Sequence, residues 1–274
     1  MTSASDAVAR HGRPAAALVP GLVSVTFRGL DVGSVLRLCR QHELGTVEWG
    51  GDVHVPAGDV ERAGRVREAT AAAGVVVSTY GSYLRCGEAG DGEVEAVVGT
   101  AAALGAPAIR VWAGRRGSSD ATSEDRRTVA EGVAAVARSA AARGLSLVLE
   151  HHDGTLTDRT DSATALLEEV ACAGAPAGSV ALSWQPPVGF DDDAALATLD
   201  AHLPHLGTVH VFSWDAEGRR LPLAARSQLW TEVFARVAGT GRVHPVLLEF
   251  VRDDDPGALA EDAAVLHELV GGRA

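Results

Sequence analysis

The stretch LSLVLEHHDGTLTD, residues 145–158, decides how the rest of the sequence is interpreted. It begins with a short apolar run after Gly144, which is too brief for a helix and is typical of a buried strand. A glutamate, two histidines and an aspartate follow at 150–153, where that run stops. One charged residue at such a place is typical of a solvated loop. A carboxylate and two imidazoles together indicate a functional strand end, provided that other strands of the chain end in the same way.

The strand pattern recurs outward from this stretch in both directions. The expected strands cover residues 18–27, 46–49, 75–80, 108–112, 145–149, 180–184, 207–212 and 245–250. Segments with helical spacing of apolar residues follow them at 32–39, 60–73, 94–104, 122–140, 161–170, 191–202, 230–237 and 259–270. We expect Asp31, Thr122 and Asp161 to cap three of these helices. Eight alternating units favour the α/β class and a closed (β/α)8 TIM barrel, as one domain over residues 17–274 after a flexible tail at 1–16.

The composition excludes several classes of protein. The 274 residues carry a net charge of −12, and no lysine occurs, which argues against a nucleic-acid partner. Cys39, Cys86 and Cys172 are far apart and form no CxxC pair, so we expect them to be reduced core residues. Neither a secretory leader nor a long apolar span is present, which predicts a cytoplasmic protein without membrane contact. No glycine-rich dinucleotide motif or Walker motif follows a strand, so a nucleotide cofactor is not expected.

Donor side chains lie at the ends of four of the expected strands. A parallel barrel places its working residues at the C-terminal ends of its strands, where Glu150, Gln185, His210 and Glu249 are found. Two carboxylates, an imidazole and an amide oxygen make a mixed donor set that suits Mn²⁺, Mg²⁺ or Co²⁺. The ordinary alternatives are a core imidazole for His210 and a hydrogen-bonding wall residue for Gln185.

The scarce aromatic residues gather at the same strand ends. Aromatic rings pack against the C–H faces of sugars, and indole and phenol groups bind hydroxyls. We expect substrate contacts from Trp49, His54, Tyr80, Trp112, His152, Trp184, Trp214 and Arg252, and we expect His151 to lie at the surface. The alternative is that bulky residues merely cover the barrel. The arginines are scattered, so we favour a substrate without a phosphate group.

Five short motifs occur in the order seen in a known family. They are VEWGGD at 47–52, LEHHDGTLTD at 149–158, SWQPP at 183–187, VHVFSWD at 209–215 and LLEF at 247–250. Over nearly its whole length the sequence resembles the xylose isomerase-like barrels, which include ketose 3-epimerases, sugar isomerases, inosose dehydratases and endonuclease IV. The resemblance implies a metal held by Glu150, Gln185, His210 and Glu249. Endonuclease IV chemistry would need further His and Asp ligands, and the acidic charge disfavours DNA.

One position departs from the family pattern. Many relatives carry Asp where this sequence has Gln185, and no histidine follows shortly after it. A neutral amide binds a hard cation more weakly than a carboxylate does. This departure counts against ordinary ketose 3-epimerisation and leaves a metal site open.

The resemblance implies a divalent-metal-dependent isomerase or epimerase that acts on a sugar, ketose or cyclitol. Glu150 and Glu249 would be the acid/base pair, and a metal, Mn²⁺ first with Mg²⁺ or Co²⁺ as alternatives, would stabilise an enediolate. A dehydratase or lyase using the same site stays open, as does a catalytically degenerate barrel that binds sugars without converting them. A homo-oligomer is also left open by the sequence.

Overall fold

The computed structural model describes residues 18–271, so the tail predicted for residues 1–16 lies outside the described part. Eight parallel strands close into a barrel in the order β1-β10-β7-β6-β5-β4-β3-β2. The barrel strands are β1 (Leu18–Val23), β2 (Thr46–Gly50), β3 (Val76–Arg85), β4 (Ala108–Trp112), β5 (Ser146–Leu149), β6 (Val180–Trp184), β7 (Leu206–Val211) and β10 (His244–Leu248). The prediction of a (β/α)8 barrel is confirmed.

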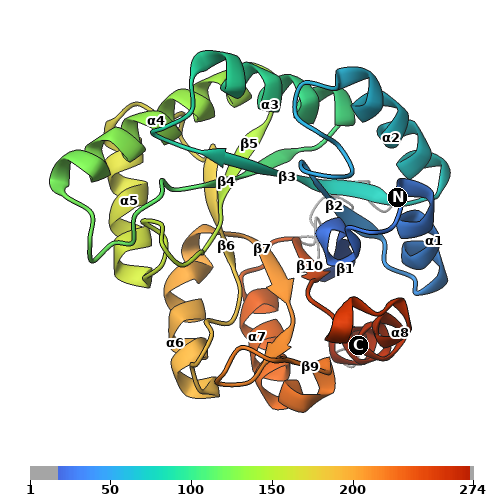
Figure 1. Ribbon diagram of the computed structural model, residues 1–274. Helices are drawn as coiled ribbons and strands as arrows, with labels where there is room; N and C mark the ends of the chain where they lie inside the picture. The colour runs from blue at the N-terminus through green and yellow to red at the C-terminus, as the bar shows by residue number, and fades with distance from the viewer. Residues whose placement is uncertain (1–17, 272–274) are drawn as a thin grey trace, which may run out of the picture.

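A helix follows each barrel strand and lies on the outside of the barrel (Figure 1). The helices are α1 (Val32–Gln41), α2 (Val60–Ala72), α3 (Asp91–Leu104), α4 (Ser123–Ala141), α5 (Thr160–Cys172), α6 (Asp192–His202), α7 (Ser227–Gly239) and α8 (Pro256–Gly271). Their inner faces are apolar; on α7, for example, Trp230, Val233 and Phe234 are fully buried. Burying one such side chain contributes about 1.5–3 kcal/mol, so the apolar stripe holds each helix against the strands.

The barrel interior and the helix layer receive alternate residues of each strand. Successive side chains of a strand point to opposite faces, so neighbours in the sequence have different surroundings. On β2, Glu48 points into the barrel, whereas the indole of Trp49 donates to Thr70 of α2 at 3.1 Å. This alternation decides which strand-end residues reach the barrel mouth.

Three local predictions differ from the structure, and one short hairpin was not predicted. The first strand stops at Val23, and Ser24–Phe27 form a 3-10 turn, because the Ser24 hydroxyl accepts a hydrogen bond from the Gly50 backbone and holds the chain over β2. Asp161 does not cap α5, which begins after Arg159 without a side-chain cap. A short hairpin of β8 (Ser213–Trp214) and β9 (Arg220–Leu221) lies between β7 and α7. Cys172 is exposed, whereas Cys39 and Cys86 are buried as expected, and all three are free thiols.

Two of the predicted caps are confirmed. Asp31 accepts a hydrogen bond from the Ser34 backbone at the start of α1, and Thr122 begins α4. Within residues 18–271, no helix combines the length and the apolar character needed to cross a membrane.

Candidate active site

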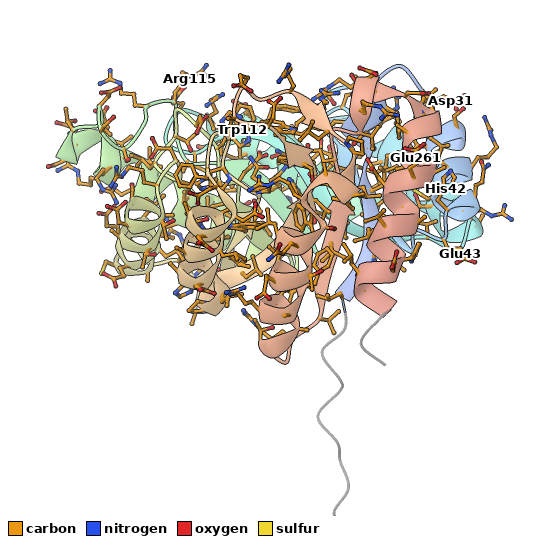
Figure 2. All side chains as sticks on the ribbon, turned by 90° about the horizontal axis from the view of Figure 1, so that it is seen from below. Asp31, His42, Glu43, Trp112, Arg115 and Glu261 are labelled. Carbon is orange, nitrogen blue, oxygen red and sulfur yellow. The ribbon has the colours of Figure 1, made fainter. Side chains whose placement is uncertain are left out.

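A cavity of about 280 Å³ opens at the C-terminal mouth of the barrel. Polar side chains from several strand ends line it, among them Arg110, Glu150, His152, Gln185 and Glu249. Trp112, another lining residue, lies toward the upper end of the molecule in Figure 2. Asp31, at the start of α1, lies at the same end, whereas Glu43, which follows α1, lies lower. The cavity therefore lies where parallel barrels place their chemistry.

A buried chain of charges crosses the floor of this cavity. Arg110 on β4 is 4% exposed, and its Nε atom lies 2.9 Å from Oε1 of Glu48 on β2. Its Nη1 atom donates to Oε2 of Glu150, which also accepts a hydrogen bond from the indole of Trp112. Contacts between opposite charges are stronger than neutral hydrogen bonds. Arg110 therefore orients Glu150 and ties β2, β4 and the end of β5 together.

His210 on β7 extends this chain on the other side of Glu48. Its Nδ1 atom lies 3.2 Å from Oε2 of Glu249, and its Nε2 atom lies 3.6 Å from Oε2 of Glu48. These contacts are ion pairs without the alignment of hydrogen bonds. Burial by itself lowers the pKa of His210, but the Glu249 and Glu48 carboxylates outweigh burial and raise that pKa to about 10. The ring is therefore a cation at neutral pH.

Charge balance in the floor favours the ionised state of Glu48. Burial by itself raises the pKa of Glu48, but Arg110 and His210 outweigh it and lower that pKa. For Arg110, burial lowers the pKa of the guanidinium, and Glu150 and Glu48 more than reverse this effect. Three carboxylates thus face two cations, because Glu249 is also within reach of His210.

Aromatic rings form the wall above the charged floor. The ring of His152 packs at 4.6 Å from that of Trp112, and the Tyr83 ring meets the Trp112 ring edge-on at 5.6 Å. Across the cavity, Trp214 lies 5.4 Å from Phe250, and both line it. Of the expected substrate contacts, the structure brings Trp112, His152 and Trp214 to the cavity.

The other expected substrate contacts lie elsewhere. The indoles of Trp49 and Trp184 donate to threonines on α2 and α6, and Tyr80 donates to the Val55 carbonyl oxygen, so all three rings pack behind the barrel wall. His54 is buried against Trp49, and its Nε2 atom lies 2.9 Å from the Leu30 carbonyl oxygen. Arg252 lies outside the cavity lining and faces Glu261 at 3.9 Å. Trp49 points away from the cavity because successive side chains of a strand alternate, and Glu48 before it points into the barrel.

His151 differs from its expected surface position. Its side chain is 6% exposed, and its ring meets that of His202 on α6 at 5.7 Å. The surroundings of this pair are apolar enough that burial lowers the pKa of both imidazoles. The sequence placed His151 beside charged residues, but the chain turns its ring toward α6, next to the cavity that it helps to line.

The four expected metal ligands do not converge as a metal site. Within residues 18–271, no group of three or more His, Cys, Asp or Glu side chains is arranged to hold a metal ion. Both ring nitrogens of His210 face carboxylates, and Glu150 already binds the Arg110 guanidinium. Gln185 donates to the His151 carbonyl oxygen at 3.0 Å, and its amide adds no negative charge. The donor set does not fit a divalent ion, because Glu150 is bound by the Arg110 guanidinium and both ring nitrogens of His210 are taken up by carboxylates.

Glu48 and Arg110 are the site residues that the sequence did not assign. The signal for Arg110 is one arginine inside the apolar run AIRVW at 108–112, where a barrel strand offers no contact with solvent. A buried charge needs an opposite charge as its partner. One such partner of Arg110 is Glu48, the glutamate of β2 that points into the barrel.

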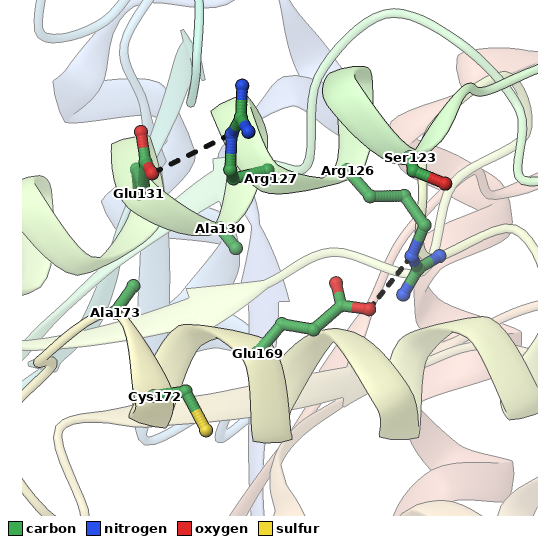
Figure 3. A pocket seen from close by; sticks show the side chains of 8 residues that line it. All are labelled: Ser123, Arg126, Arg127, Ala130, Glu131, Glu169, Cys172 and Ala173. Carbon is green, nitrogen blue, oxygen red and sulfur yellow. Dashed lines mark hydrogen bonds and ion pairs between the residues drawn. The ribbon is translucent and has the colours of Figure 1, made fainter.

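A larger hollow on the outside of the barrel lacks comparable chemistry. It measures about 580 Å³ and lies between α4 and α5 (Figure 3). Its charges are paired with each other: Arg126 meets Glu169 at 3.0 Å, and Arg127 meets Glu131 at 4.0 Å. Its lining comes from α4 and α5 and not from the barrel strands, so we place the functional site at the barrel mouth.

The fold and this acidic mouth define a parallel α/β barrel with an enzyme-like site. The xylose isomerase-like TIM barrel family matches residues 36–269, and the chain belongs to that family. No curated protein sequence matches the chain significantly.

Solved structures share the fold at low sequence identity. The probable 3-DHS dehydratase AsbF of Bacillus anthracis has 17% identity and a TM-score of 0.75, covering 91% of this chain and 98% of that one. A xylose isomerase-like TIM barrel protein of Mycobacterium smegmatis, solved in complex with magnesium, has 16% identity and a TM-score of 0.67 over 93% and 98% of the two chains. D-Psicose 3-epimerase of Clostridium cellulolyticum H10 has 14% identity and a TM-score of 0.66 over 91% and 97%.

Proposed function

We propose that this protein is an isomerase or epimerase of a small sugar, ketose or cyclitol. The reaction would be proton transfer at a carbon next to a carbonyl group. One observation carries the proposal: Glu150 and Glu249, from the ends of β5 and β10, line one cavity beside two buried cations. A carboxylate removes such a proton efficiently when nearby positive charge stabilises the oxyanion that forms.

The roles of the residues follow from their contacts. One of the two glutamates takes the proton from carbon, and the bonding electrons move to the carbonyl oxygen to give an enediolate. Delivery of a proton by the other glutamate to the opposite face gives an epimer. Return of the proton to the neighbouring carbon, with transfer of the hydroxyl proton from one oxygen to the other, gives an isomer. Glu150 is held by Arg110 and the Trp112 indole, whereas His210 holds Glu249, so both carboxylates are fixed before substrate binds. Such fixed geometry lowers the entropic part of the barrier.

The cavity favours a small and uncharged substrate. Its volume of about 280 Å³ is at the lower end for ligand sites, which suits one sugar or cyclitol ring. Trp112 and Trp214 line the cavity and add apolar ring surface for the C–H groups of such a ligand. Arg28, which also lines the cavity, is paired with Asp52 at 2.8 Å, and this carboxylate lowers its attraction for a phosphate.

Several finer expectations lie outside this proposal. The Mn²⁺ implied by the family resemblance is not part of the proposal, since the donor set does not fit a divalent ion. The cytoplasmic location, the oligomeric state and the elimination reaction of a dehydratase or lyase rest on the sequence and the resemblance alone.

Solvent exchange tests the proposal most directly. The protein is incubated in D₂O with a panel of ketoses, aldoses and inosose-type cyclitols, and deuterium at the carbon next to the carbonyl group is followed by NMR. We expect exchange with at least one compound, and a loss of about 10²–10⁴-fold in Glu249→Gln. Glu261→Gln, an exposed residue of α8 outside the cavity, is the matched control. Tight sugar binding without exchange would instead support the degenerate barrel, and loss of water from the substrate would support a dehydratase.

A further inference from the structure

We infer that Arg110 is the resident cation of this site, where it binds one of the expected metal ligands, Glu150, and that the protein works without a metal. The inference rests on the proposed function for its catalytic part and on the contacts of Arg110 for its structural part.

The position of Arg110 is fixed from several sides. Its guanidinium lies between Glu48 and Glu150, each of which it contacts, and the ring of Tyr83 lies 5.8 Å from its central carbon. A Cβ atom added at Gly81 of β3 would lie 2.9 Å from Nη2 of Arg110, so the barrel leaves space for the guanidinium at this point. The side chain is 4% exposed and still lines the cavity. Arg110 is therefore a fixed, buried residue of the site.

The charge of the site leaves little attraction for a metal ion. The side chains of Glu48 and Glu150 both face the Arg110 guanidinium, which stays charged, and Glu249 faces His210. A divalent ion at Glu150 would lie beside that guanidinium in a buried site, where like charges repel strongly. Gln185 supplies no negative charge in return, and its Nε2 group is turned to the His151 carbonyl oxygen.

The arrangement suits an enolising reaction in which no metal takes part. When the C–H bond breaks, its proton goes to a glutamate and its electron pair moves to the carbonyl oxygen. The positive field of Arg110, which lines the cavity, stabilises the resulting negative charge, while the Trp112 indole N–H group holds Glu150 in place. The proton then returns from the glutamate to carbon, so no oxidant, reductant or further reactant is needed.

Metal titration is the first test. Full-length protein dialysed against EDTA and then against buffer is titrated with MnCl₂, and free Mn²⁺ is followed by its EPR signal. We expect no stoichiometric binding at micromolar Mn²⁺, and solvent exchange that is equal in EDTA and in added Mn²⁺. One tightly bound Mn²⁺ per chain, or exchange that is lost in EDTA and restored by Mn²⁺, would overturn the inference.

Variants of Gln185 and Arg110 test whether the Arg110 guanidinium prevents Mn²⁺ binding. Gln185→Asp alone adds a carboxylate but retains the guanidinium, so we expect no Mn²⁺ binding. The double change Arg110→Met with Gln185→Asp removes the cation, and we expect Mn²⁺ affinity to rise at least tenfold over the wild type. Mn²⁺ binding by Gln185→Asp alone, or none by a folded double variant, would contradict the assignment.

A charge-preserving variant covers the case in which Arg110→Met does not fold, as judged by circular dichroism. Arg110→Lys retains one positive charge without the two-pronged contact. We expect it to retain part of the exchange rate in EDTA and to bind no Mn²⁺; a requirement for Mn²⁺ would overturn the inference. If no compound in the panel undergoes exchange, the proposed function fails, while the Mn²⁺ titrations still decide whether Arg110 holds the cation position.

Discussion

Gly81 shows how closely one residue is matched to the charges beside it. A Cβ atom there would lie 2.7 Å from Oε1 of Glu48 and 2.9 Å from Nη2 of Arg110, closer than real contacts allow. We expect Gly81→Ala to displace the ion pair and to lower the free energy of unfolding by about 1–3 kcal/mol. Urea unfolding measures the change. Gly45→Ala is the control, because nothing lies within 4 Å of the added methyl group; equal effects of the two changes would refute the explanation.

Trp112 allows the hydrogen bond to Glu150 to be separated from the packing of its ring. Trp112→Phe retains an aromatic face in the cavity but removes the indole N–H donor to Glu150. We expect the solvent exchange rate to fall about tenfold or more, since a donor that orients a catalytic carboxylate typically contributes on the order of 1–3 kcal/mol. The matched control is Trp49→Phe, which also removes an indole N–H donor, because the Trp49 indole binds Thr70 behind the barrel wall. That control should reduce stability and leave exchange unchanged.

At the level of elements, the start of α4 depends on a reciprocal pair of hydrogen bonds. The Thr122 hydroxyl accepts from the Asp125 backbone N–H at 3.1 Å, and the Asp125 carboxylate accepts from that of Thr122 at 2.9 Å. We expect Thr122→Ala to cost about 1 kcal/mol, seen as a fall in Tm of about 2–4 °C by calorimetry. Thr164→Ala, inside α5, removes only a bond to the Thr160 carbonyl oxygen and should leave Tm nearly unchanged.

The sequence predicts the elements well because their physical causes are local. Alternating strands and helices, with glycines between them, indicate the eight barrel units, and all eight strands are present within residues 18–271. The hairpin of β8 and β9 was missed because its strands have only two residues each, too few to show a period. The end of β1 was missed because a hydrogen bond from distant Gly50 sets it.

The candidate site is less predictable because it depends on the direction of single side chains. Glu150 and Glu249 follow their strands directly, and both reach the cavity as expected from their positions. Trp49, beside the inward Glu48, faces the helix layer, because neighbouring residues in a strand cannot share a face. The role of Arg110 follows only from its partners on two other strands, which no spacing in the sequence encodes.

For the molecule as a whole, buried imidazoles link stability to pH. His54, His151, His202 and His244 lie on different elements, and burial lowers the pKa of each. A buried neutral histidine has less affinity for a proton than the same residue in the unfolded chain, so the unfolded state takes up more protons in acid. Each of the four therefore lowers stability as the pH falls below about 6.5, the ordinary pKa of histidine.

His202 should make the largest identifiable contribution to this acid sensitivity. Its Nδ1 atom donates to the Thr198 carbonyl oxygen at 2.7 Å, and burial against His151 lowers its pKa from 6.5 to about 4. The stability it supports is complete above pH 6.5 and is lost as the pH falls toward 4, to a total of about 3 kcal/mol. We expect His202→Phe, which cannot take up a proton, to flatten the fall in unfolding free energy between pH 6.5 and 4, measured by urea unfolding. His42→Gln, at the end of α1, should keep the wild-type slope. An unchanged slope in His202→Phe would show that the pH dependence arises at other groups.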